Sequence, residues 1–181
     1  MAKRKDISTM KLTSALKKWM DQEEWNDEIQ IDDVENGARV DTTVGINNQG
    51  HRLILQTDET GEVFTVTLMS PFNVPAARMA DMARILNRLN VGLRFGKLYC
   101  WDDEDSNPVT FEYVIDVEGS ELVPQQIGNM LRPAMNTFAV SGELLAAVAL
   151  TKQPIDALWA AFREEGEKRE SAHEETGPSE L

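Results

Sequence analysis

The sequence has one cysteine, two histidines and no long run of apolar residues. Because Cys100 stands alone among the 181 residues, no disulfide can form within the chain, and we expect a reducing compartment, the cytoplasm. His51 and His173 are too far apart in sequence for paired-ligand spacing, so we predict no metal site and no cofactor. The longest nearly apolar run, residues 144–150, falls well below the ~20 residues that span a bilayer, so we expect no membrane contact.

Positive charge is also scarce. The chain has 18 Lys and Arg against 31 Asp and Glu, a formal net charge of −13, which argues against nucleic acid as a partner. The charges are unevenly placed, because residues 1–18 hold six Lys or Arg and one Asp, whereas residues 164–181 hold seven Glu, one Lys and one Arg. We therefore expect a basic arm at 1–7, a single domain at 8–163 and a disordered acidic tail at 164–181.

What is present is a globular composition, with 41% hydrophobic and 27% charged residues. Apolar side chains alternate in some segments and recur at helical spacing in others, which predicts an α+β fold with an antiparallel sheet. We expect a helix that begins at Ser8 or Thr9 and another at 75–90, a helical region from 124 with a kink at Pro133 and a break at Gly142, and a short helix at 154–162. The expected strands are 28–34, 38–46, 51–57, 62–69, 93–101 and 109–117.

Methionine is common on the expected helices. The apolar stripe of the second helix is Met79, Met82, Ala83, Leu86 and Leu89, and that of the third is Ile127, Met130, Leu131, Met135 and Phe138. Core packing is the simpler interpretation, and an adaptable binding surface is the alternative. Because residues 70–75 contain two prolines, we expect them to interrupt the sheet. Phe72 and Val74 would then lie in a loop next to Met79, as a candidate surface for a protein partner.

Motifs for catalysis are missing. The chain has no GxSxG nucleophile turn and neither of the two common glycine-rich phosphate loops. The acidic run 102–105 lacks the glycine and glutamate spacing of an EF-hand, so we interpret it as a solvated hairpin tip. Glu112 and Asp116 lie on the wetter face of an alternating strand, where solubility explains them better than acid–base chemistry. We therefore expect a protein that is not an enzyme.

One stretch carries a family resemblance. Leu86-Asn87-Arg88-Leu89-Asn90 ends the second helix, and Arg94-Phe95-Gly96-Lys97 follows in the next strand. Together with the strand at 111–116, the helix after Pro124 and the order of elements, this stretch resembles the YbjN family of bacterial sensory transduction regulators over about residues 10–150. On this basis Leu86, Asn87, Asn90, Phe95 and Gly96 are structural positions. Asn90 is suited to the left-handed conformation at a helix end.

The resemblance implies a fold like that of type III secretion chaperones, which bind protein segments, often as homodimers. It supplies no catalytic residues. Our leading hypothesis is a protein-binding module, chaperone-like or a regulatory adaptor, that captures a segment of another protein through an apolar patch or a free sheet edge. The alternative is a small-molecule sensor or enzyme with a pocket between the sheet and the second helix.

Overall fold

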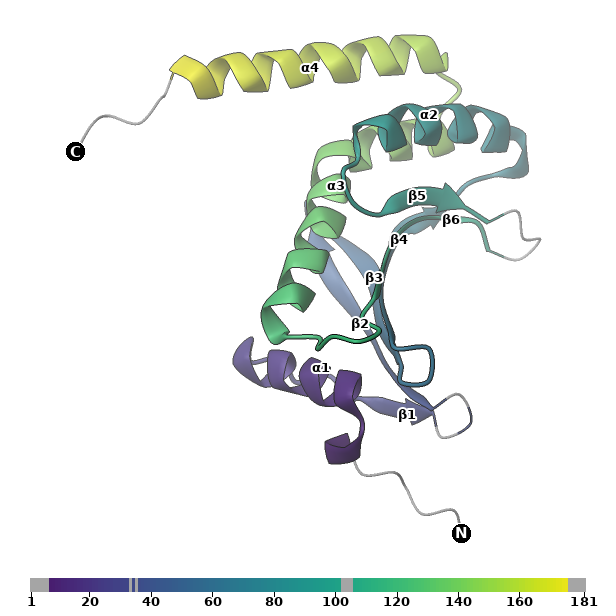
Figure 1. The fold of residues 1–181 in the computed structure, drawn as a ribbon. Helices are drawn as coiled ribbons and strands as arrows, with labels where there is room; N and C mark the ends of the chain where they lie inside the picture. Colours follow the sequence, from purple (N-terminus) through teal and green to yellow (C-terminus); the bar gives the residue numbers. More distant parts are fainter. Residues whose placement is uncertain (1–6, 33, 35, 102–105, 176–181) are drawn as a thin grey trace.

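A computed structural model shows a curved antiparallel sheet with helices packed on one of its faces (Figure 1). It describes residues 7–32, 34, 36–101 and 106–175, so residues 1–6 of the expected basic arm, the acidic run 102–105 and residues 176–181 lie outside the described residues. The order is α1 (Lys11–Gln22), β1 (Gln30–Asp32), β2 (Gly37–Ile46), β3 (Gln49–Asp58), β4 (Val63–Asn73), α2 (Met79–Gly92), β5 (Lys97–Cys100), β6 (Pro108–Asp116), α3 (Pro124–Leu150) and α4 (Ile155–Glu175). This order confirms the predicted α+β class.

The strands of the sheet lie in the order β1-β2-β3-β4-β6-β5, and every neighbouring pair is antiparallel. Asn47 and Asn48 join β2 to β3, both with positive φ, as a two-residue type I′ turn requires. The ends of two strands differ from expectation, since only three residues of 28–34 and four of 93–101 enter the sheet.

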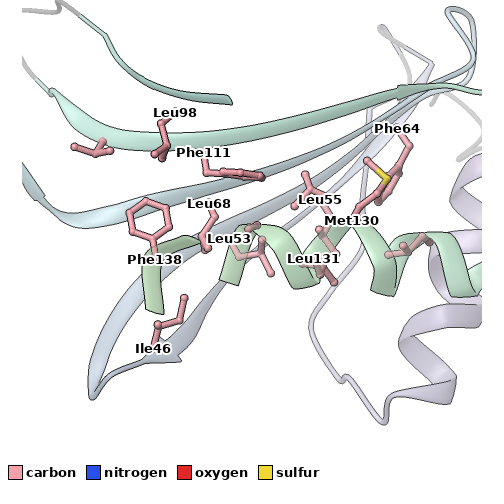
Figure 2. Close-up of a cluster of buried hydrophobic side chains, with 14 of the residues drawn as sticks. Ile46, Leu53, Leu55, Phe64, Leu68, Leu98, Phe111, Met130, Leu131 and Phe138 are labelled. Atoms are coloured by element: carbon pink, nitrogen blue, oxygen red, sulfur yellow. The ribbon is translucent and has the colours of Figure 1, made fainter. Parts of the chain in front are cut away.

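The core lies between the inner face of the sheet and α1, α2 and α3. Figure 2 shows Leu53, Leu55 and Leu68 of the sheet gathered along α3 with Met130 and Phe138. Burying each such side chain contributes about 1.5–3 kcal/mol. The expected stripe on α1 is confirmed, because Leu12, Leu16, Trp19 and Met20 are all buried. On α2 the buried face includes Ile85 in place of Ala83, and on α3 Met135 is exposed.

The helix α3 runs without a break through both Pro133 and Gly142, which corrects the expected interruption at Gly142. Pro133 removes a single backbone donor. The hydroxyl of Thr137 donates to the Pro133 carbonyl at 2.7 Å. Gly142 costs about 1 kcal/mol against alanine, far less than the burial of Leu144, Leu145 and Val148 beyond it provides.

The start of α1 is capped from a distant part of the chain. Neither Ser8 nor Thr9 caps it, because the helix begins at Lys11 after a 3-10 turn, and its N-cap residue makes no side-chain hydrogen bond. Glu59, in the turn between β3 and β4, accepts hydrogen bonds from the backbone N–H groups of Leu12 and Thr13 at 3.1 and 2.7 Å. A carboxylate at a helix N-terminus is favoured by the unpaired N–H groups there.

The helix α4 continues to Glu175, past its expected end at residue 162, so the structure describes residues 164–175 as helix where the sequence predicted a disordered tail. Its second half is stabilised by three ion pairs spaced four residues apart, and each such pair contributes a few tenths of a kcal/mol. These pairs are Arg163–Glu167, Glu164–Lys168 and Glu165–Arg169.

By length and hydropathy, α3 is the one helix among the described residues that could cross a membrane. Its packing gives a different explanation for its composition, because its apolar side chains face the sheet and α1 (Figure 2). We therefore interpret α3 as the central core helix.

Candidate functional site

The expected partner surface at Phe72, Val74 and Met79 is not an exposed patch. Val74 is only 1% exposed, while Phe72 and Met79 are half-buried against the core. The sheet also continues through this segment, with an irregularity between Met69 and Asn73. The hydroxyl of Ser70 sustains it, accepting from the N–H of Val109 at 2.9 Å and donating to the carbonyl of Phe72 at 2.6 Å. The expectation that Val74 is exposed in a loop is therefore wrong, whereas a role for Phe72 and Met79 in partner binding stays a prediction.

The family-motif residues join the end of α2 to β5. The side-chain amide of Asn90 donates to the carbonyl of Leu98 at 2.9 Å and accepts from its N–H at 2.7 Å. Asn90 is not among the residues with positive φ, and α2 continues to Gly92, so Asn90 connects the last turn of the helix to a strand and does not form a left-handed turn. Leu86 is buried and Asn87 is exposed.

Gly96 and Phe95 continue this junction. Gly96 has φ +72°, and a Cβ at this position would overlap the ring of Phe111. Phe95 is 47% exposed and stacks on Tyr113, with ring centroids 5.7 Å apart. The guanidinium of Arg94 lies 5.3 Å from the Phe95 ring centroid.

The position of the alternative pocket, between the sheet and α2, is filled by core side chains. Met82 and Ile85 of α2 are fully buried, as is Phe111 of β6 opposite them. A groove lies elsewhere, between α3 and α4.

A free strand edge lies along β2. β1 pairs only with Gly37, Ala38 and Arg39, so residues 40–46 have no strand on that side among the described residues. The type I′ turn makes Ile46 and Gln49 a hydrogen-bonded pair. Alternation along the ladder then directs the backbone N–H and C=O groups of Asp41, Thr43 and Gly45 away from β3. An edge of this kind can accept another strand.

Charged side chains flank this edge on the outer face of the sheet. Arg52 donates to both carboxylate oxygens of Asp41, at 2.9 and 2.6 Å, and Arg39 donates to Oδ2 at 2.8 Å. Hydrogen bonding from Arg52 lowers the pKa of Asp41 to about 2. The carboxylate is therefore ionised and paired at neutral pH, next to Thr43, which is exposed.

The inner side of the same edge ends at α3. Nδ2 of Asn47, in the turn after β2, donates to the carbonyl of Ala139 at 2.9 Å. Met135, 36% exposed, lies one turn before Ala139 on α3 and shares this helix face. An added strand would have apolar surface next to its inward side chains, at Val44 and towards Met135.

Asn47 also borders a groove of about 500 Å³ between α3 and α4. Apolar side chains make up most of the lining, and polar groups stand at the rim. The lining consists of Asn47, Ala139, Val140, Glu143, Leu144, Ala147, Leu158, Ala161, Phe162, Glu165, Gly166 and Arg169. The sequence predicted only a short helix at 154–162 and did not reveal the groove, because the two walls of the groove come together only when α4 folds back on α3.

The groups with perturbed pKa values lie outside this groove. Burial lowers the pKa of His51, whose ring packs on Phe138 with centroids 4.9 Å apart. Burial, followed by the charge of Glu112, raises the pKa of Tyr99. Among the described residues, no three His, Cys, Asp or Glu side chains gather as a metal site. The surfaces that stand out are thus an unpaired strand edge and an apolar groove, which suit binding.

These features define a class of α+β domain in which helices cover one face of an antiparallel sheet and part of its edge stays unpaired. Within that class, the chain belongs to the YbjN family, whose model, described as "Putative bacterial sensory transduction regulator", matches residues 13–139. No curated protein matches the chain.

Two solved structures are similar in fold. A crystal structure of YbjN from E. coli, titled as a putative transcription regulator, is 13% identical, with a TM-score of 0.48 over 77% of this chain and 92% of that one. A chain of the HopA1–SchA chaperone–effector complex is 17% identical, with a TM-score of 0.45 over 75% of this chain and 98% of that one. α4 lies outside the residues that the family model matches.

Proposed function

We propose that this protein is a non-enzymatic binding module that captures an extended segment of another protein by adding it as a strand to the free edge of β2. The observation that supports this most is the mismatch between a ten-residue β2 and a three-residue β1. It leaves three residues, Asp41, Thr43 and Gly45, with backbone groups directed outward. Strand addition draws affinity from these groups and specificity from alternate side chains.

The family description, a sensory transduction regulator, is compatible with a role as a regulatory adaptor or chaperone. Such a role requires reversible capture of a protein segment and no reaction chemistry. We also propose that the protein acts in the cytoplasm and forms a homodimer, as the family resemblance implies.

The test is a photo-crosslinking amino acid placed at Thr43 in the native host. Because Thr43 sits on the free edge, we expect crosslinks to a short extended segment of a different protein. The same label at Gln56, exposed but in the central strand β3, should give few. Mass spectrometry of the crosslinked peptides measures both yields.

A proline variant supplies the control for the backbone. Thr43→Pro removes an outward N–H without breaking the ladder to β3, so capture should fall by about tenfold with little loss of fold. Thr43→Ala keeps the N–H and should capture normally. Equal capture by the proline variant, or crosslinks at Thr43 to peptides of this chain alone, would exclude the proposal.

A further inference from the structure

The groove between α3 and α4 is a second surface without a role in the proposed strand capture. Val140 is 56% exposed and Phe162 half-buried, so the groove leaves large apolar side chains in contact with water. Alanines and Gly166 on both walls leave space for the backbone or bulky side chains of an occupant. A volume of about 500 Å³ admits several apolar side chains.

The walls of the groove favour a helical occupant. Both walls are α-helices, whose backbone groups are satisfied within each helix, so no free row of N–H and C=O groups is offered to a strand. Recognition must come from side chains. A helix with apolar residues at i, i+3, i+4 and i+7 is the peptide form that fills such a groove.

The charge along the groove favours a basic occupant. Glu143 stands at the rim, and Glu165 and Arg169 pair with each other at 2.5 Å, so the charged residues of the lining leave a net negative charge. Over its full length, Ile155–Glu175, α4 carries seven acidic and three basic residues. A second copy of the chain would bring another acidic α4 against this one, and like charges across an interface disfavour association.

We propose that the α3–α4 groove binds an amphipathic helix of a partner protein, with leucine-like side chains in the groove and lysine or arginine along α4. This inference extends the proposed function. It rests on the premise of that proposal that the molecule binds a partner protein. Asn47 directly follows β2 and borders the groove, so one partner can contact the two surfaces in succession.

The probe is a fluorescein-labelled peptide of roughly 18 residues, made of leucine and lysine with leucines at helical spacing. Its binding to the full chain is measured by fluorescence anisotropy at physiological ionic strength. Ala161 lines the groove and Ala160 does not, although both are exposed on α4. We expect Ala161→Trp to fill the groove and weaken binding by about tenfold or more, and Ala160→Trp to bind like the wild type.

Two further measurements separate this site from the strand edge and from self-association. Thr43→Pro should bind the peptide normally, and a peptide with glutamate in place of lysine should bind at least about tenfold more weakly. Equal binding by Ala161→Trp and the wild type, loss of binding with Thr43→Pro alone, or tight binding of the glutamate peptide would each overturn the groove assignment. So would a change in oligomeric state of Ala161→Trp in sedimentation, which would identify a second copy as the occupant.

Discussion

At the scale of single residues, the junction between α2 and β5 explains why the family motif has its particular composition. Asn90 satisfies both backbone groups of Leu98 that face away from β6, and Gly96 lets the strand pass against the ring of Phe111. An amide carries both a donor and an acceptor, and among the other side chains only that of glutamine does so with similar geometry. The motif is therefore structural, and it closes the β5 edge at Leu98.

Gly96 gives a test of this interpretation with a matched control. Gly96→Ala places a Cβ at φ +72° and against Phe111, so we expect a loss of about 3 kcal/mol in the free energy of unfolding. Gly119 has the same φ but open space around it, so Gly119→Ala should cost only about 1 kcal/mol. Urea denaturation measures both. Equal losses would show that the contact with Phe111 contributes nothing.

At the scale of elements, some of the contacts that stabilise the helices and strands can be predicted from the sequence, and others cannot. The hairpins could be predicted because their turn residues, such as Asn47 and Asn48, are local. The capping of α1 by Glu59 could not be predicted, because Glu59 and the start of α1 are nearly fifty residues apart in sequence. Nothing in the local sequence distinguishes Glu59 from the other glutamates. The free edge of β2 was equally hidden, because it depends on how far β1 extends beside it.

The ion pair between Asp41 of β2 and Arg52 of β3 should make the free energy of unfolding depend on pH in the acid range. The pKa of Asp41 in the folded protein, about 2, lies below the value near 3.8 of an unpaired carboxyl. Its stabilising contribution is therefore complete above pH 4 and is lost as the pH falls towards 2. Because Arg52 is more than half exposed, we expect about 1 kcal/mol after allowing for solvent screening.

Asp41→Asn should remove this part of the acid dependence. The variant is expected to be less stable than the wild type at neutral pH and to approach it near pH 2, as followed by thermal unfolding at a series of pH values. Asp21, which forms an exposed ion pair within α1, is the matched control, and Asp21→Asn should change stability little at any pH. A constant difference between Asp41→Asn and the wild type from pH 7 to pH 2 would contradict the role of the carboxylate charge.

At the scale of the whole molecule, charge and apolar surface oppose each other. Each chain carries a formal net charge of −13. It also exposes three large apolar side chains near the β5–β6 end of the sheet, those of Phe95, Val114 and Trp101. Among the described residues, β5 pairs with β6 only as far as Glu112, so residues 113–116 of β6 extend past it. Apolar contact and an unpaired edge favour association of two copies, while the net charge resists it.

The expected homodimer should therefore be stabilised by salt. Added NaCl screens the repulsion between two chains of −13 and leaves apolar burial intact, so the dimer fraction should rise with ionic strength. Sedimentation velocity at micromolar concentration, at low and at near-physiological salt, should show a species of twice the chain's 20.3 kDa growing with salt. Ala161→Trp, altered only in the groove, should follow the same curve. A single monomeric species at every salt concentration would exclude the dimer, and a dimer that dissociates as salt is added would mean that ion pairs, and not apolar contacts, hold it together.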